Sequence, residues 1–521
     1  MWEFVGVVSY LLINFYFTRV QANKAAILAL TMNRVGDFGL SIAFFALFAV
    51  FGSLNYSTIY SLSPYINETA ITIIALLLLS GAAAKSSQLG LHSWLPGSME
   101  APTPVSALLH AATLVTAGIY LLLRSSPILE YSPTALLVIT LIGASTAFFG
   151  ATVGLVSNDL KRIIAMSTIS QLGYMVLAIG LSQYNVALMH TLNHSFFKAL
   201  LFLAAGGVIH SLTDQQDIRK MGGLIKFLPF TYTILLIGSL SLLATPWLTG
   251  FYSKDLILEL AYGAYSFSGI YAYILGSITA GLTAFYSFRI ISLVFLTFPN
   301  SSKTIYNNVH ESSWLLVIPF IILALFSIFF GFIFSDLFVG MGTDFFGNSL
   351  YLYPNNISLV EAEFSLPLWI KLLPALLSLL GALLSLYIYQ FNYRFVNNII
   401  NTKSGRNIYT FLNGKYLFDI IYNHYIISFG LNLGYIISKV LDRGVMELVG
   451  PYGLSSALNK TALAISQSDD RVISTYSTYI IFNTLCLIFI IFAPILISSS
   501  LLFEIRLIII YTASAFFVLY N

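Results

Sequence analysis

Long apolar runs recur from one end of this sequence to the other, and they restrict the fold more than any other feature. A run of about 20 residues spans a bilayer core as an α-helix, and only helices or closed barrels satisfy the backbone there. A barrel would instead show alternating segments of roughly 10 residues. Charged residues make up 9% of the chain, against roughly 25% in soluble proteins. The sequence therefore predicts an all-α polytopic membrane protein.

Length and hydropathy predict about 13 transmembrane helices. We expect them at residues 2–17, 34–52, 69–91, 104–124, 134–156, 161–182, 185–209, 227–261, 266–298, 313–335, 367–390, 474–497 and 501–520. Two regions read as broken helices, because prolines stand between or inside apolar runs and free backbone carbonyls. The breaks lie at Pro96, Pro102 and Pro104, and at Pro246 with Gly250. Paired breaks of this kind are typical of inverted repeats around an ion site.

Residues 399–470 have a different pattern, in which charges recur among apolar residues at helical spacing. Such a segment is too polar to span a membrane and favours an amphipathic helix. We predict a long lateral helix, broken near Gly450-Pro451, that lies along the membrane surface or against partner subunits. An ordinary loop with two short helices is the alternative.

Two ionisable residues of the first apolar regions are expected to form a pair. Glu3 stands in the first run and Lys85 at the end of the third. A charge at the bilayer centre costs at least about 2.5–3.5 kcal/mol, so such residues are functional candidates. If their helices pack together, making and breaking the pair could move a proton. A static ion pair that locks two helices is the other interpretation.

His190, His194 and Lys198 are spaced four residues apart, so they share one helix face. At 1.5 Å per residue they climb roughly 12 Å, which is the geometry of a proton relay, since neutral histidine both donates and accepts protons. A structural polar seam remains open. A metal site is disfavoured, because no HExxH glutamate or third ligand accompanies the histidines.

Lys254, with Asp255 and Glu259, follows the break at Pro246. It either ends a buried half-helix or is an interfacial lysine whose ammonium reaches water. Charges that lie near expected helix ends are less informative: Asp37, Lys161 and Arg289. We interpret four further histidines as loop or interface residues: His92, His210, His310 and His424.

Several function classes lack support in this sequence. A net charge of +3 is too small to argue for nucleic acid. The single cysteine, Cys486, excludes disulfides and cysteine-ligated clusters within the chain. There is no Gly-rich nucleotide loop and no haem-type ligand pair, so the chain shows no means of binding NADH or carrying electrons.

Several motifs, in this order, resemble the antiporter-like, Mrp-type membrane subunits of respiratory complex I. They are WEFVGVVSYLLINF, NRVGDFG, KSSQLGLHSWLPGSMEAPTPVSALLHAATLVTAG, NDLKRIIAMSTISQLGYM, HTLNHSFFKALLFLAAGGVIH and GFYSKD, and they cover residues 2 to about 290. In that family several helices precede the WEFVG motif. The resemblance therefore implies that the N-terminal helices are missing from this sequence.

The resemblance assigns roles that spacing alone does not. It implies that Glu3 and Lys85 are the family's acid–lysine pair, with Asp37 on the neighbouring helix. It implies that His110 and the histidine ladder form the central hydrophilic axis. Lys254 matches the lysine of the second broken helix, towards the side where protons leave, and Lys161 matches the NDLKR lysine.

The implied function is proton translocation in the membrane arm, driven by electron transfer from NADH to ubiquinone in partner subunits. This chain would be part of an enzyme, with no redox centre of its own; FMN, iron–sulfur clusters and ubiquinone are expected in partners. An Mrp-type cation/proton antiporter subunit is the alternative. The implied setting is the mitochondrial inner membrane, with other membrane-arm and accessory subunits as partners. We expect 1–298 to be the antiporter-like core, 299–398 further helices, 399–470 the lateral helix and 471–521 an anchor.

Overall fold

The computed structural model describes residues 2–343, 345–351, 358–467 and 471–497. Within these ranges the chain consists of helices and their connections, and the only strand-like pairing is an isolated bridge between Asp159 and Asp217. The predicted all-α fold is confirmed. Contacts divide the chain into two units, Met1–Asp419 and Ile420–Asn521, and we describe each on its own.

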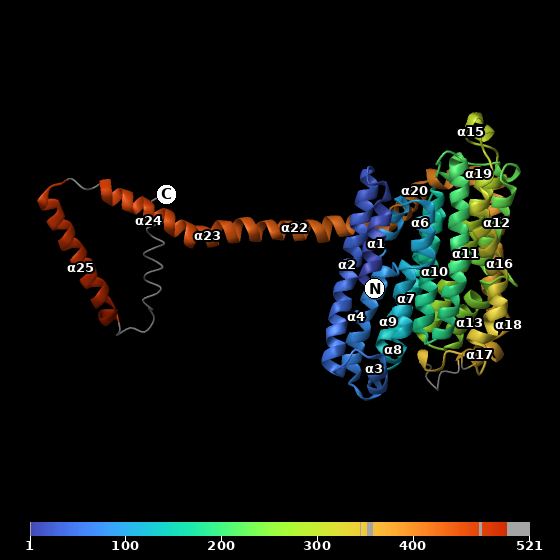
Figure 1. The fold of residues 1–521 in the computed structure, drawn as a ribbon, viewed down its shortest axis with the longest axis horizontal. Helices are drawn as coiled ribbons and strands as arrows, with labels where there is room; N and C mark the ends of the chain where they lie inside the picture. Colours follow the sequence, from blue (N-terminus) through green and yellow to red (C-terminus); the bar gives the residue numbers. More distant parts are fainter. Residues whose placement is uncertain (1, 344, 352–357, 468–470, 498–521) are drawn as a thin grey trace. The chain divides into compact units, whose positions relative to one another are not determined.

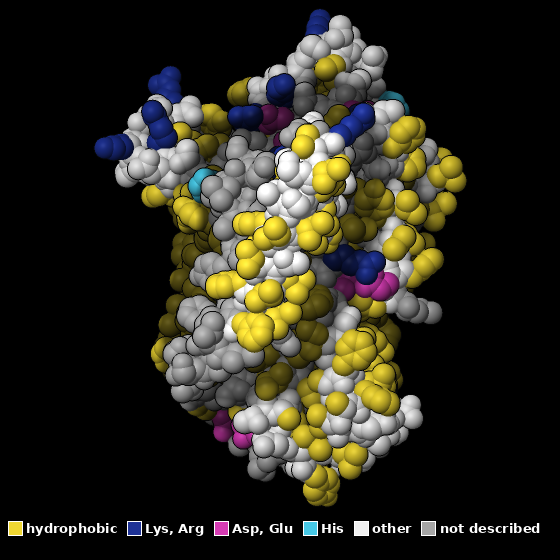
Figure 2. Space-filling model, turned by 90° about the vertical axis from the view of Figure 1, so that its left-hand side faces the viewer, with side chains coloured by type: hydrophobic (Ala, Val, Ile, Leu, Met, Phe, Trp, Pro, Cys, Tyr) yellow, Lys and Arg dark blue, Asp and Glu magenta, His cyan; other side chains and the backbone are white. Residues whose placement is uncertain are grey.

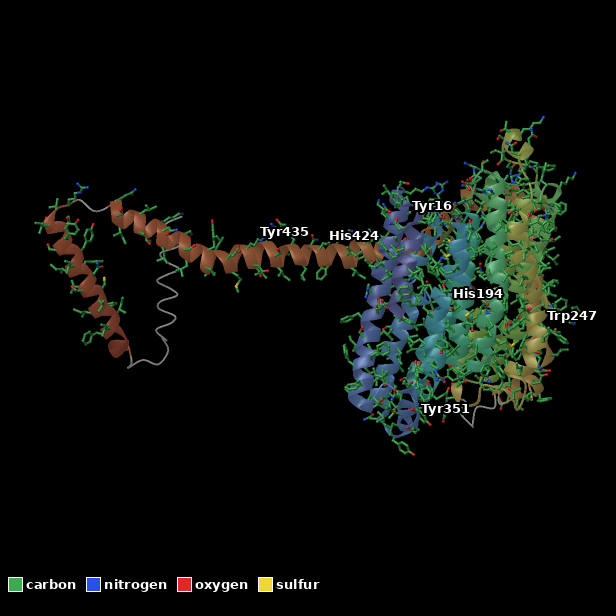
Figure 3. The ribbon with its side chains drawn as sticks, in the orientation of Figure 1. Tyr16, His194, Trp247, Tyr351, His424 and Tyr435 are labelled. Carbon is green, nitrogen blue, oxygen red and sulfur yellow. The ribbon has the colours of Figure 1, made fainter. Side chains whose placement is uncertain are left out.

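Unit 1 is a bundle of helices that run between two ends, with Tyr16 labelled at one end and Tyr351 at the other (Figures 1 and 3). Prolines in the first turn begin several helices, as expected where an amide hydrogen bond is not needed. The helices are α1 Trp2–Ile13, α2 Val20–Phe51, α3 Tyr56–Leu62, α4 Glu68–Lys85, α5 Trp94–Gly97, α6 Thr103–Ala107, α7 Leu114–Arg124, α8 Ser126–Glu130, α9 Pro133–Val156, α10 Leu160–Gly180, α11 Tyr184–Ser211, α12 Pro229–Leu243, α13 Leu256–Gly263, α14 Phe267–Ile291, α15 Lys303–Asn307, α16 Trp314–Val339, α17 Ser358–Phe364, α18 Leu368–Phe391, α19 Tyr393–Asn401 and α20 Lys403–Asn413.

The α10 helix lies at the centre of unit 1, and nearly all of its residues are buried. It packs against α9 on one side and against α11 on another. Glycines let the α9 and α10 backbones approach closely: a Cβ on Gly150 would lie 2.7 Å from the Ser170 nitrogen, and one on Gly173 would lie 2.5 Å from the Ala147 nitrogen. Small residues allow this kind of helix contact in membranes, where packing replaces the hydrophobic effect.

Eleven described helices are long and apolar enough to cross a membrane, and two shorter apolar helices accompany them. These thirteen elements do not correspond one to one with the predicted spans, so the predicted count is not confirmed. The span expected at 501–520 lies outside the described residues. Hydrophobic side chains cover much of the surface, as Figure 2 shows for one face.

Both predicted interruptions coincide with non-helical backbone. After α4 the chain is irregular until α5, where Pro96 lies, and Pro102 and Pro104 stand at the start of α6. The α12 helix ends at Leu243, and helical structure resumes at Phe251, so Pro246 lies between two half-helices. Whether the two halves form inverted repeats remains a prediction.

Among the described residues of unit 1, three π-helical turns occur: Leu108–Ala112 and Phe251–Asp255, which follow the two breaks, and Ser292–Leu296, which continues α14. The first contains His110 and the second contains Lys254. Single π-helical turns inside α-helices are frequent at functional sites. Two of the three therefore coincide with residues that the sequence had already singled out.

Unit 2 begins at Ile420, the last residue of α21 (Phe418–Ile420), and contains a helical run through α22 Ser428–Tyr435 to α23 Glu447–Val449, with π-helical stretches between. Gly450 leaves the helical conformation, with φ −89° and ψ −135°, and α24 Pro451–Gln467 follows. The last described helix is α25 Ile473–Ile497. The run from Lys415 to Val449 meets the length and composition of a membrane span. The predicted long helix with a break near Gly450-Pro451 is confirmed, whereas its place along the membrane surface and the domain division stay predictions.

Candidate functional site

Lys85 is the last residue of α4 and is 1% exposed. A cation suits a helix C-terminus, because the helix dipole is negative there. The Lys85 ammonium lies 5.5 Å from the centroid of the Trp2 ring, and the Trp2 indole N–H donates to Asp37 Oδ1 at 2.6 Å. The α1 backbone also lies close to the ammonium, since a Cβ on Gly6 would stand 3.0 Å from Lys85 Nζ. Helices α1, α2 and α4 thus place one lysine beside an acid and an indole.

Glu3 does not form the ion pair with Lys85 that we predicted. Its carboxylate pairs with Arg34 at 2.9 Å, and about half of each side chain is exposed. We had placed the start of this span at residue 34, whereas α2 begins at Val20. Arg34 and Asp37 therefore lie in the interior of a long helix, and the expectation that Asp37 lies near a helix end was wrong.

His110 is fully buried in the π-helical turn that precedes α7. Its Nε2 lies 2.9 Å from Ser98 Oγ, and the Ser98 hydroxyl donates to the Leu95 carbonyl at 2.5 Å. Because that hydroxyl hydrogen is committed, Ser98 Oγ is the acceptor and His110 carries its proton on Nε2. The Nδ1 atom is then an acceptor, and it has no hydrogen-bond partner among the described residues.

The ladder of His190, His194 and Lys198 lies on α11, and all three side chains are buried. The Lys198 ammonium donates to Ser167 Oγ at 2.6 Å. His190 Nε2 lies 3.1 Å from Gln171 Oε1. Both partners come from α10, so the ladder faces the central helix. Figure 3 shows His194 inside the bundle.

His190 also connects the ladder to the second break. Its Nδ1 lies 2.9 Å from Ser253 Oγ, and the amide of Asn193 donates to the same hydroxyl at 3.0 Å. Ser253 precedes Lys254 in the π-helical turn. His194 stands between His190 and Lys198, and neither of its ring nitrogens has a hydrogen-bond partner among the described residues. The ladder therefore has hydrogen-bond partners at both ends, on α10 and at the second break.

Lys254 is 1% exposed, so it is not an interfacial lysine; it lies in the π-helical turn that begins the second half-helix. Its ammonium donates to Thr283 Oγ1 at 3.0 Å and to the Leu242 carbonyl at 3.3 Å. The carbonyl is one that the helix break leaves free, because α12 ends there. The next residue, Asp255, lines a cavity of about 650 Å³, and this cavity is also lined by Glu259, Asp336 and Glu363.

Lys161 lies at the start of α10, is 5% exposed and donates to the Ala101 carbonyl at 3.1 Å. It lines a cavity of about 390 Å³ together with Glu100, His210 and Asp214. His210 is thus exposed towards a polar cavity at the end of α11. Arg289, expected near a helix end with little cost, is 5% exposed.

Contacts join some predicted residues and leave others apart. His190, His194 and Lys198 share α11, and His190 contacts Ser253 beside Lys254. The His110 ring lies 6.0 Å from that of Phe202, one helical turn beyond Lys198. These five residues therefore form one group. Among the described residues, no hydrogen bond joins Lys85 to this group. Between Lys85 and His110 stands Trp94, whose indole N–H donates to the Ala84 carbonyl at 2.9 Å and whose ring centroid lies 6.2 Å from that of His110.

Sequence reasoning missed the neutral partners of the charged residues: Ser98, Ser167, Gln171, Ser253 and Thr283. Serine and threonine are common in membrane helices, so their identity carries no signal. Spacing could have found two of them, because Ser167 and Gln171 stand four residues apart and face the ladder with the same period. We also interpreted His92 as a loop or interface residue, but it is fully buried, with its ring 4.4 Å from Phe149 and 4.9 Å from Phe418.

The described residues contain no group of three or more His, Cys, Asp or Glu side chains that could hold a metal ion. The chemistry available to the site is proton exchange between histidine, lysine and hydroxyl groups. Similarity to known proteins identifies the family to which the chain belongs.

Residues 1–283 match the family described as NADH:quinone oxidoreductase/Mrp antiporter, and residues 349–493 match the NADH dehydrogenase subunit 5 C-terminus. NADH-ubiquinone oxidoreductase chain 5 of Schizophyllum commune is 67% identical over 98% of this chain and 74% of the relative. The chain belongs to the NADH-ubiquinone oxidoreductase chain 5 family. The relative of the same name from Mycosarcoma maydis is 62% identical over 94% of this chain and 73% of the relative.

Membership of the chain 5 family confirms the resemblance of the sequence motifs to antiporter-like subunits of complex I. Among solved structures, the Mrp complex from Dietzia sp. DQ12-45-1b matches with a TM-score of 0.65 and 24% identity, and the match covers 89% of this chain and 48% of that one. At this identity the likeness concerns the fold alone. The antiporter-like fold of this multi-pass membrane protein is therefore shared beyond the chain 5 family.

Proposed function

We propose that this chain translocates protons as a membrane-arm subunit of NADH:ubiquinone oxidoreductase in the mitochondrial inner membrane. Its relatives carry the name of that enzyme, and the chain supplies buried ionisable residues rather than a nucleotide loop. Electron transfer would take place in partner subunits, which hold FMN, iron–sulfur clusters and ubiquinone. This chain would respond to them through electrostatics and conformational change.

One observation carries the proposal: the ladder joins two helix interruptions through side chains that can exchange protons. At one end the His110 ring lies 6.0 Å from that of Phe202, one helical turn beyond Lys198, and at the other end His190 contacts Ser253 beside Lys254. Ionisable residues inside a membrane bundle are costly, and they typically mark ion paths or proton relays.

Each predicted residue has a place in this proposal. Lys85 receives or loses a proton under the influence of Asp37, with Glu3 and Arg34 as a second pair. The proton equilibrates along His110, Lys198, His194 and His190. Lys254 and Asp255 then connect the ladder to the acidic cavity. Lys161 faces the polar cavity at the other end of α11.

A vesicle experiment tests this function. The purified complex is reconstituted, and protons moved per NADH oxidised are measured with a pH-sensitive dye. Lys198→Met keeps the length of the side chain and removes its charge, so we expect fewer protons per NADH. Lys226→Met, at an exposed position between helices, is the matched control. An unchanged proton-to-electron ratio in an assembled Lys198→Met complex would contradict the proposal.

The antiporter alternative receives less support. The Mrp likeness is to fold at 24% identity, whereas the chain 5 relatives are far more similar. Co-purification distinguishes the two. A complex subunit is isolated with flavin and iron–sulfur proteins, and an antiporter shows sodium-dependent transport without them.

A further inference from the structure

A second feature of unit 1 has no part in the proton path. A cavity of about 460 Å³ lies where α9 and α14 end, where α18 ends, and where α19 and α20 begin. Its volume falls within the range of roughly 300–1,000 Å³ that is usual for small-molecule sites. Three membrane helices end at this level, and two short helices without buried residues follow. The cavity therefore lies at a boundary between apolar and polar surroundings.

Arg289 provides the charge of this cavity. Its guanidinium donates to the carbonyls of Leu155 and Ser157, at 2.5 and 2.7 Å, and to Asn158 Oδ1 at 2.8 Å. These partners are neutral, so the positive charge is not cancelled by them. The Arg289 Nε atom is buried and has no hydrogen-bond partner among the described residues. A buried cation usually requires an anion nearby.

The protein does not supply that anion in the described part of the cavity wall, where no lining residue is acidic. The second arginine, Arg219, is already paired with Asp217 at 2.6 Å. Hydrogen bonds from Arg219 lower the pKa of the Asp217 carboxyl, so this pair is stably ionised. Arg289 is thus the cation that remains available to an external anion.

The rest of the wall suits a hydrocarbon chain. Phe285, Ile388, Val396, Ile400 and Leu412 line it, together with three tyrosines: Tyr389, Tyr393 and Tyr409. The α19 sequence, YRFVNNIIN, separates apolar residues from asparagines at helical spacing, as in helices that lie in the membrane interface. Tyrosines are enriched at the same level. Basic pockets between membrane helices bind anionic lipid headgroups.

We propose that this cavity binds an anionic phospholipid, with the phosphate against the Arg289 guanidinium and an acyl chain along Ile388, Val396 and Ile400. The site is separate from the proton ladder, and the proposal does not depend on the proposed function. A free phosphate would satisfy Arg289 but would leave the apolar wall without a partner, which favours the lipid.

Photo-crosslinking in the purified complex tests the site. The probe is phosphatidylglycerol with a diazirine on its acyl chain, and mass spectrometry locates the label. We expect labelling within residues 388–412. Unlabelled dioleoyl-phosphatidylglycerol should compete, whereas dioleoyl-phosphatidylcholine and inorganic phosphate should compete poorly. Arg289→Gln should lower labelling by about fivefold, the ratio that corresponds to roughly 1 kcal/mol per basic residue near a lipid headgroup.

Ile400→Trp serves as a second variant, because it fills the apolar part of the cavity and leaves the Arg289 hydrogen bonds in place. It should lower labelling even if Arg289→Gln fails to assemble. Lys226→Gln, an exposed lysine away from the cavity wall, should leave labelling unchanged. Equal competition by phosphatidylcholine, full competition by inorganic phosphate, or unchanged labelling in Ile400→Trp would each overturn the proposal.

Discussion

Lys85 and Lys254 are both buried beside a helix interruption, yet different parts of the chain control them. The charges that act on Lys85 belong to α1 and α2, whereas Lys85 itself ends α4. Lys254 is hydrogen-bonded to Leu242 and Thr283, and its acid is the next residue, Asp255. The surroundings that set the charge of Lys85 come from other helices, whereas those of Lys254 come mostly from residues at its own helix break.

This difference indicates where a conformational change would act. Two unit charges attract by about 3 kcal/mol at roughly 6 Å and an effective dielectric constant of about 20, and this falls by about 1 kcal/mol at roughly 10 Å. A shift of α2 against α4 would therefore change the charge state of Lys85. Asp255 moves together with Lys254, so the same shift would leave that pair nearly unchanged. We infer that Lys85 is the responsive site and Lys254 the fixed one.

The largest expected effect comes from the fixed site. Lys254→Ala removes the cation that joins the ladder to the acidic cavity, and it leaves the Leu242 carbonyl without its donor. We expect proton pumping and coupled turnover to fall by at least about tenfold, which an added barrier of roughly 1.4 kcal/mol would produce. Lys303→Ala, at an exposed position in α15, is the control. Unchanged pumping stoichiometry and turnover would remove Lys254 from the path.

Alanine substitutions of two glycines test how rigid the surroundings of Lys254 and Lys85 are. A Cβ at Gly250 would overlap the Ser241 carbonyl, which belongs to the backbone of α12 and cannot turn away. A Cβ at Gly6 would lie 3.0 Å from Lys85 Nζ, the far end of a flexible side chain. We expect Gly250→Ala to impair assembly and thermal stability strongly and Gly6→Ala only slightly, as measured by blue native gels and thermal denaturation. Equal loss in both variants would contradict the comparison.

Substitutions of Asp37 and Glu3 test which carboxylate controls the protonation of Lys85. Asp37 is 7% exposed and hydrogen-bonded to Trp2, whereas Glu3 is about half exposed and paired with Arg34. Asp37→Asn should therefore lower coupled turnover more than Glu3→Gln. Both variants are isosteric, so packing is preserved. The interpretation of Lys85 would need revision if Glu3→Gln had the larger effect, and a fully active Glu3→Gln would leave only a structural pair.

The smallest expected effect concerns a neutral partner of the ladder. Ser253→Ala removes a hydroxyl that contacts both His190 and Asn193. A single such hydrogen bond contributes about 0.5–1.5 kcal/mol, so we expect coupled turnover to fall by roughly two- to tenfold. Ser268→Ala, whose hydroxyl contacts Ser266 outside the ladder, is a suitable control. Identical rates in the two serine variants would argue against a role for Ser253.

Most of the fold could be predicted because the length and hydropathy of an apolar run identify a membrane helix. The predicted 134–156 and 161–182 became α9 and α10 with small changes at the ends. The prediction failed where polar residues stand inside a long helix. We began the second span at 34, but α2 begins at Val20, and Lys24 and Arg34 lie on its exposed face.

The site could be predicted only in part, for a related reason. Residues on one helix are fixed by spacing, so His190, His194 and Lys198 were correctly placed on one face. Pairing between helices depends on their rotation and depth, which sequence does not encode locally. This is why Glu3 was assigned to Lys85 although the structure pairs it with Arg34, and why the contact of Trp2 with Asp37 was not anticipated.

The glycine contact between α9 and α10 has one more consequence. Ser167 and Gln171 face the ladder from α10, while Gly173 on the same helix lies so close to the α9 backbone that even a Cβ would overlap it. A proton path across a membrane that carries a voltage must also prevent protons from leaking back. We expect the tight contact between α9 and α10 to be such a barrier, so that protons do not leak past the ladder and dissipate the membrane potential.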